Sequence, residues 1–160
     1  MFREMKRGKK RLSDEGTQAI LEAGDYGILS TVGEDGTPYG IPLNYVFHDG
    51  RIIFHCAPSG YKLDNIAHCS RVSFCVVAQA DIVPEKFTTR FQSVVAFGTA
   101  RILEGDEKKE GLLALVRRLC PDHIPAGETY INNAWDKTTV VAVDIAHLSG
   151  KAAPGPGGRE

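Results

Sequence analysis

His55 and Lys62 are the two residues of this chain whose types and spacing best fit a chemical role. His55 stands near the end of an apolar run, residues 52–57, and a turn at 58–60 separates it from a short helix with Lys62 in its first turn. Helix N-termini present unpaired backbone N–H groups and about half a positive charge, to which Lys62 adds a full charge. This arrangement predicts a phosphate site, with His55 facing the molecule that carries the phosphate. A solvated lysine at a helix start is the plainer alternative.

Other motifs for nucleotides and metals are absent from the sequence. No G-x-x-x-x-G-K-[ST] run occurs, and the one dense glycine cluster, residues 155–158, has no helix after it. There is no C-x-x-C or H-E-x-x-H pair, and the adjacent His55 and Cys56 would point to opposite faces of a strand. We therefore expect no metal site.

Length and composition indicate one globular domain. The chain has 160 residues, 42% of them hydrophobic, and a net charge of −1, which suits a single core and argues against disorder. No apolar run approaches the roughly 20 residues of a membrane span, and no apolar stretch of a signal peptide follows the basic N-terminus. We expect a cytoplasmic protein with no membrane contact, whose four cysteines stay reduced.

The first twelve residues, 1–12, are predicted to form a basic arm. Residues 1–11 hold six lysines and arginines against one acid, Glu4. Such a segment can bind nucleic acid, but the remainder of the chain is acidic on balance and no aromatic residue follows Phe2 within the arm. We therefore predict a solvated or subunit-crossing arm and no nucleic-acid partner.

Residue periodicity predicts a chain made mainly of strands. Helices are expected from Ser13 to Gly24, after Gly60, and from Asp106 to Pro121. Six strands are predicted, at 26–32, 38–47, 51–56, 71–78, 90–103 and 138–145. Residues 79–89 are interpreted as a loop. Residues 149–160 are interpreted as a disordered tail after a domain at 13–148.

Hairpin connections between six strands favour a small antiparallel barrel with a few short flanking helices. Pro38 and Pro42 cannot donate to a ladder, so their strand needs a free edge or a bulge, and Gly98 marks a bend or bulge in the fifth strand. In strand 51–56 the alternation puts Ile52, Phe54 and Cys56 on the core side. Ile53, His55 and Ala57 share the other side, which we interpret as a ligand or subunit surface.

Short segments in a fixed order carry a family resemblance over roughly residues 1–145. They are residues 2–5, 29–32, 36–39, 42–46, 53–57, 60–64, 72–76 and 91–98. This set resembles the FMN-binding split-barrel superfamily, which includes pyridoxamine 5′-phosphate oxidase, and within it the nitroimidazole-resistance (Nim) type proteins. The resemblance implies a six-stranded split barrel and a homodimer that holds two FMN molecules at its subunit interface.

The resemblance also implies which residues meet the FMN. These are Ile41, Pro42, Leu43 and Asn44 along the ring and ribityl chain, Phe54 and His55 beside the cofactor, Gly60, Tyr61 and Lys62 at the phosphate, Ser93 near the polar edge of the flavin, and Trp135 over the ring from the partner subunit. His55 is the expected catalytic residue. One phosphate site, with no second basic cluster or glycine turn for a pyrophosphate, favours FMN over FAD.

Two departures argue against vitamin B6 oxidation. The oxidases have an Arg-Lys pair where this chain has Tyr61 and Lys62, and they end in an arginine-bearing segment where this chain has residues 151–155. The first hypothesis is therefore an FMN-dependent oxidoreductase acting on a nitroaromatic or quinone-like molecule, with a small-molecule electron donor. The alternatives are a non-catalytic flavin carrier or sensor, and a split barrel that uses F420 or haem instead.

Overall fold

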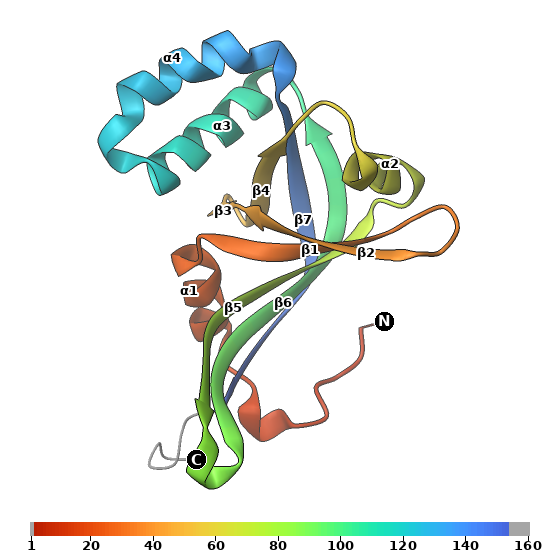
Figure 1. Cartoon of the computed structure of the whole chain (residues 1–160), viewed down its shortest axis with the longest axis vertical. Helices are drawn as coiled ribbons and strands as arrows, with labels where there is room; N and C mark the ends of the chain where they lie inside the picture. Colours follow the sequence, from red (N-terminus) through yellow and green to blue (C-terminus); the bar gives the residue numbers. More distant parts are fainter. Residues whose placement is uncertain (1, 154–160) are drawn as a thin grey trace.

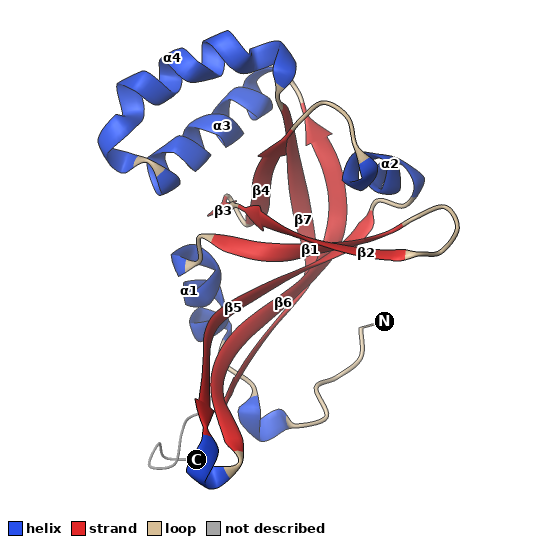
Figure 2. Cartoon of the chain, viewed as in Figure 1, coloured by secondary structure: helices blue, strands red, loops and turns tan. Residues whose placement is uncertain are grey.

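Antiparallel strands make up most of the computed structural model, which describes residues 2–153 (Figures 1 and 2). The strands are β1 Tyr26–Val32, β2 Pro38–Asn44, β3 Val46–His48, β4 Arg51–Cys56, β5 Arg71–Val83, β6 Thr88–Leu103 and β7 Thr139–Ala153. The α-helices are α1 Asp14–Ala23, α2 Tyr61–His68, α3 Gly105–Leu119 and α4 Ile124–Ala134. Short 3-10 turns are η1 Gly8–Lys10, η2 Pro84–Lys86, η3 Pro121–His123 and η4 Trp135–Lys137.

The strands form one curled antiparallel sheet in the order β2-β1-β5-β6-β7-β4-β3. β2 lies at one end of the sheet, so Pro38 and Pro42 stand on the free edge that the sequence required. The predicted strand 38–47 is divided at Tyr45, whose buried hydroxyl donates to the Leu21 carbonyl oxygen at 2.7 Å. The split-barrel prediction is confirmed, with seven strands in place of six because of this corner.

Two hydrophobic clusters lie on opposite faces of the sheet. The barrel core includes Leu29, Phe54 and Phe74, all fully buried. The second cluster lies where α3 covers β4, β6 and β7 (Figure 1). Ile53 belongs to it and is 1% exposed. The prediction that Ile53 faces a ligand or subunit surface is therefore wrong: the alternation holds, but α3 packs on that face.

The predicted loop at 79–89 is also wrong. These residues complete a long hairpin in which β5 and β6 pair as far as Val83 and Thr88 (Figure 1). Pro84 falls in the turn η2, where it breaks no ladder, and Phe87 closes the turn with a left-handed φ of 50°. A register shift between Val77 and Gln79 disturbs the alternation that marks a strand in the sequence.

Both ends of the described chain pack on the sheet. Phe2 stacks on His147 with ring centroids 4.9 Å apart, and the Leu12 N–H donates to the Gly150 carbonyl at 3.0 Å. Most of residues 2–12 are exposed, as predicted for a solvated arm, while these contacts hold the segment against the sheet of its own chain. Residues 149–153 belong to β7, so the predicted tail begins too early, and its remainder, 154–160, lies outside the described residues.

Candidate functional site

The candidate site starts where β4 ends and α2 begins. Phe54 is fully buried in the barrel core, whereas the next residue, His55, is exposed. His55 lies in register with Val140, which lies in register with Leu103. These two partners belong to the cluster beneath α3, so His55 stands at the open end of that face of the sheet.

The backbone at the start of α2, here called the cradle, has features predicted for an anion site. Gly60 has a φ of 132°, which favours glycine, and a Cβ built on it would meet no atom within 4 Å. The Gly60 carbonyl accepts from the N–H groups of Leu63 and Asp64, at 2.8 and 3.2 Å. The N–H groups of Tyr61 and Lys62 have no acceptor within residues 2–153. They are two of the unpaired donors at the positive end of the helix.

Polar and aromatic contacts fix α2 against the β1–β2 hairpin. The buried Asn65 amide donates to the Thr31 hydroxyl at 2.9 Å. Tyr61 meets Tyr39 edge to face, with ring centroids 4.8 Å apart. Tyr61 itself is exposed and lines a shallow depression with two carboxylate residues, Glu34 and Asp35. The cradle is therefore positive at the helix end and bordered by acids on the hairpin side.

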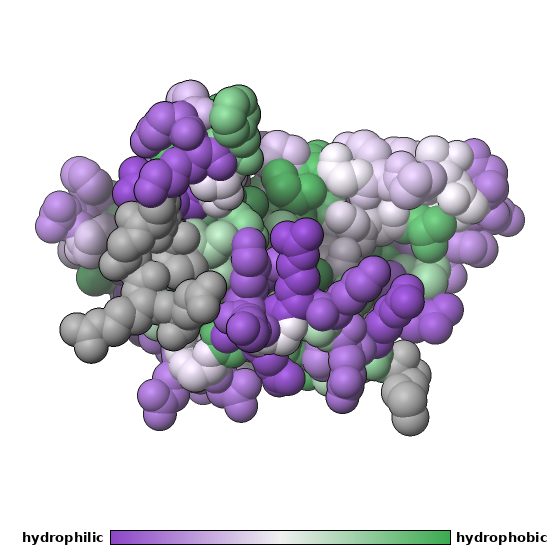
Figure 3. Space-filling view, turned by 90° about the horizontal axis from the view of Figure 1, so that it is seen from below, coloured by the Kyte–Doolittle hydropathy of each residue, from purple (hydrophilic) through white to green (hydrophobic). Residues whose placement is uncertain are grey.

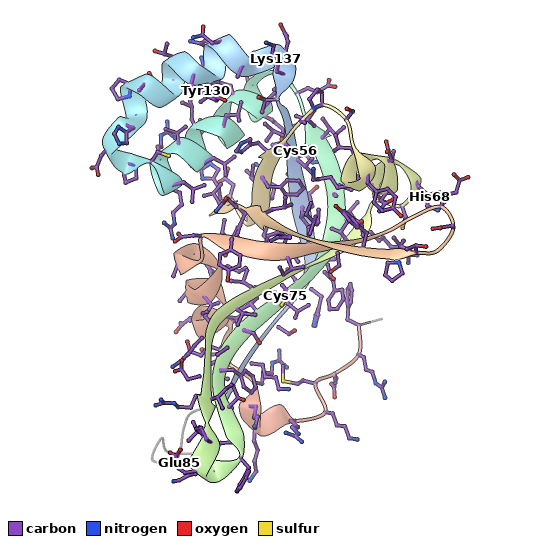
Figure 4. The ribbon with its side chains drawn as sticks, in the orientation of Figure 1. Cys56, His68, Cys75, Glu85, Tyr130 and Lys137 are labelled. Carbon is purple, nitrogen blue, oxygen red and sulfur yellow. The ribbon has the colours of Figure 1, made fainter. Side chains whose placement is uncertain are left out.

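Desolvation near the end of β4 shifts two pKa values. Neighbouring groups crowd His55 enough to remove part of its hydration, and this desolvation lowers the pKa of the imidazole. Desolvation raises the pKa of the Cys56 thiol, while the positive charge of Lys62 acts in the opposite direction. Lys62 thus lies within electrostatic reach of Cys56, which Figure 4 labels where β4 leads into the loop to α2. At neutral pH the site holds a neutral imidazole and a protonated thiol beside an ammonium group.

In the segment of β2 that was predicted to bind the flavin ring, only every second side chain is exposed. Ile41 and Leu43 pack against the barrel core, while Pro42 and Asn44 are exposed. The Asn44 amide nitrogen donates to the Asp25 carbonyl oxygen at 3.0 Å. A ligand lying along β2 would thus meet the Pro42 and Asn44 side of the strand.

Ser93 and Trp135 do not join the other predicted site residues within one chain. Ser93 and Leu103 are ten residues apart on β6, which corresponds to roughly 33 Å along a strand, and Leu103 lies in the row of His55. Trp135 is half-buried in the second cluster, where the Lys108 ammonium lies 4.4 Å from its ring centroid and donates to its carbonyl at 2.8 Å. Trp135 is thus part of the packing of α3 in its own chain.

Sequence reasoning missed a cavity of about 480 Å³. It lies against β1, β5 and β6, and its wall includes Phe2, Ser30, Arg71 and Thr99 but no predicted site residue. No motif links these residues, because they come from separate strands and the arm, and only the sheet topology brings them together. Residues 2–153 contain no group of side chains suited to a metal ion, and none of their helices is long and apolar enough to cross a membrane.

Solved structures share this fold at low sequence identity. The flavocytochrome Anf3 of Azotobacter vinelandii aligns with a TM-score of 0.83 and 21% identity, over 96% of this chain and 73% of that one. The FAD and heme binding protein of Mycobacterium smegmatis gives 0.79 and 21%, over 91% and 74%. A protein of Bacteroides thetaiotaomicron VPI-5482 assigned to 5-nitroimidazole antibiotic resistance gives 0.74 and 19%, over 88% and 85%.

The sequence itself is matched at the level of the family. A search of curated proteins gave no match to this chain. The family described as pyridoxamine 5′-phosphate oxidase matches residues 13–152, from the cap of α1 almost to the end of β7. That match spans the whole curled sheet and the cradle at α2, and the chain therefore belongs to the pyridoxamine 5′-phosphate oxidase family of split barrels.

Proposed function

We propose that this protein is a flavin-dependent oxidoreductase that binds FMN as a homodimer. The cradle at the start of α2 carries the proposal: Gly60 opens the space before two free N–H groups, and Lys62 adds a charge beside the end of β4. Family membership supports the same interpretation, and two solved structures of this fold are named for flavin or haem binding.

The residues of the site would have distinct roles. Lys62 and the N–H groups of α2 would hold the phosphate, and Pro42 and Asn44 would lie along the cofactor. When bound, FMN supplies the electron-transfer chemistry. His55 is exposed and, because its pKa is lowered, neutral at pH 7, so it can donate one hydrogen bond to an oxygen of the acceptor and orient it. A nitroaromatic or quinone offers such an oxygen.

The charge around the cradle favours FMN over FAD. A single helix end and a single lysine suit one phosphate, and a second phosphate on the hairpin side would approach the carboxylates of Glu34 and Asp35. Chromatography of the cofactor released by acid tests this proposal. We expect FMN, at one molecule per chain, and recovery of FAD or haem instead would contradict it.

Lys62→Ala tests the phosphate assignment. A charge-assisted contact to phosphate corresponds to roughly ten- to hundredfold in the dissociation constant. Fluorescence titration of the apoprotein with FMN should show this loss for Lys62→Ala, while Lys137→Ala, an exposed lysine on η4, binds as tightly as the parent. If all three proteins bound FMN with equal affinity, the assignment of Lys62 to the phosphate site would be wrong.

His55→Ala separates an enzyme from a flavin carrier. In an enzyme, the variant keeps its fold and most of its FMN, while acceptor reduction per bound flavin slows roughly 10²-fold. The second candidate function, a carrier or sensor, predicts an unchanged rate per bound flavin for every nitroaromatic and quinone tested. Stopped-flow oxidation of the dithionite-reduced protein measures that rate directly.

A further inference from the structure

A second cluster of positive charge lies far from Lys62. It is at the end of the molecule where the β5–β6 hairpin and β7 meet the basic arm. Lys9, Lys10, Arg11 and Arg90 line a cavity of about 280 Å³ around Phe91. The ammonium groups of Lys10 and Lys151 lie 5.7 and 5.6 Å from the centroid of the Phe91 ring. Figure 3 views this end and shows hydrophilic side chains gathered across it.

Backbone contacts hold the basic arm in this place. Arg11 forms an antiparallel bridge with Lys151, and the next residue, Leu12, donates to the Gly150 carbonyl at 3.0 Å. The 3-10 turn η1 closes with the Arg11 N–H donating to the Gly8 carbonyl at 2.9 Å. The cations of the cavity are therefore positioned by the fold of the arm on β7.

The positive charge of this cavity is poorly compensated. Among residues 2–153, Lys9, Lys10, Arg11 and Lys151 form no ion pair, and Arg90 has only a long one, 3.9 Å to Asp81. Two ammonium groups that share one aromatic ring repel each other, and each retains hydrogen-bond donors. An anion with several negative oxygens would relieve the repulsion and accept from both.

We propose that this basic cavity binds the phosphate groups of a phosphorylated dinucleotide that serves as the electron donor. This inference rests on the proposed function, because it assumes that Ser93 lies near the bound flavin. Ser93 is the register partner of Lys151 and lies two residues from Phe91, on the same face of β6. Since the family resemblance implies that Ser93 lies near the polar edge of the flavin, a donor anchored at Phe91 would lie beside that edge.

Calorimetric titration with NADPH and NADH tests the cavity directly. We expect the parent protein to bind NADPH at least about tenfold more tightly than NADH, because the additional phosphate meets a cationic wall. Lys10→Gln/Lys151→Gln should weaken NADPH binding roughly ten- to hundredfold and reduce its salt dependence. The control, Lys109→Gln/Lys137→Gln, removes two exposed lysines from α3 and η4 at the other end of the molecule and should bind like the parent.

The outcomes separate this inference from the proposed function. Equal NADPH affinity in the parent and in Lys10→Gln/Lys151→Gln overturns the cavity assignment, even when FMN and acceptor reduction are intact. Binding of a single-stranded oligonucleotide that is lost in the same variant, with no preference for NADPH over NADH, also overturns it. Conversely, the protein could lack FMN and still prefer NADPH over NADH, with this preference lost in Lys10→Gln/Lys151→Gln. That result would support the cavity assignment and refute the proposed function.

Discussion

His55 shows how one residue can be accessible and still poorly hydrated. Phe54 before it is buried and Cys56 after it is half-buried, while His55 itself is exposed. The resulting desolvation opposes protonation, and therefore keeps the imidazole neutral at pH values where a free histidine begins to ionise. A neutral ring can donate and accept one hydrogen bond each, which suits an orienting role better than that of a cationic acid.

The lowered pKa of His55 predicts a pH dependence of stability. An unfolded chain has a histidine pKa of about 6.5, so below that value the unfolded state binds a proton more readily than the folded state. The contribution of His55 to stability is therefore full above about pH 6.5 and falls as the pH drops toward its folded pKa. Urea unfolding at pH 7.5 and 5.5 should show a smaller loss of stability on acidification for His55→Gln than for the parent. Equal losses would contradict the shift.

The charge of Lys62 at Cys56 predicts a change in thiol reactivity. Removing that charge in Lys62→Gln leaves only desolvation acting on Cys56, so the thiolate fraction at fixed pH falls. We expect alkylation of Cys56 by iodoacetamide at pH 8.5, followed by mass spectrometry of its peptide, to slow roughly twofold or more. The exposed Lys86→Gln, in the turn η2 at the tip of the β5–β6 hairpin, should leave the rate unchanged. An unaltered alkylation rate in Lys62→Gln would show that the Lys62 charge does not affect the Cys56 thiol.

At the scale of residues, the sequence indicated which side chains close together in the chain lie near each other. It did not indicate contacts between side chains far apart in the chain. His55 and Lys62 are seven residues apart, joined by one turn, so their spacing alone indicated a shared site. The engagement of Asn44 by Asp25 and of Trp135 by Lys108 depends on elements far along the chain. Nothing in the local pattern distinguishes such side chains from ligand contacts.

At the scale of elements, sequence reasoning located a bulge at Gly98 correctly along the chain, but the extra residue lies in the neighbouring strand β7 and not in β6. The pairing of β6 with β7 shifts register between Phe97 and Gly98, and Ala146 of β7 is the residue left without a partner in the ladder. A Cβ at Gly98 would overlap the Asp144 carbonyl oxygen and stand 2.8 Å from Val143 Cγ1. Glycine thus permits the close approach of the two strands at this point.

Gly98→Ala should consequently destabilise the fold. Overpacking of this kind costs about 1–3 kcal/mol, measured as the free energy of unfolding in urea. The matched substitution Gly40→Ala places its Cβ 3.6 Å from Ile28 Cγ2, an ordinary contact, and should change stability by less than about 0.5 kcal/mol. Equal stabilities of the two variants would show that the strands can separate at the bulge without cost.

The elements that were not predicted have weak or interrupted patterns. Helix α4 begins with Ile124 and Pro125 and includes Gly127, and it carries a single buried residue, Ile131. A helix with so little apolar face gives almost no periodic signal, and it forms here because α3 packs against it. In the outer part of the β5–β6 hairpin, residues 77–82 and 88–90 are likewise all exposed, so alternation is lost there.

At the scale of the molecule, the proposed FMN site would draw on two chains if it includes both Lys62 and Ser93. Figure 4 labels Cys56 and Glu85 at opposite ends of the fold, and Ser93 lies on the strand that leaves the Glu85 turn. Light scattering after size exclusion should therefore give twice the 17.4 kDa mass of one chain. A monomer with full FMN occupancy would show that Ser93 takes no part in the flavin site.

The distance between Ser93 and the row of His55 also has a consequence that can be tested genetically. If each flavin meets Lys62 of one chain and Ser93 of the other, Lys62→Glu and Ser93→Trp damage opposite halves of every site. Neither variant alone would bind FMN, yet unfolding and refolding the two together should restore about a quarter of the sites, all in mixed dimers. Two inactive alleles of this gene would then complement each other when expressed in the same cell.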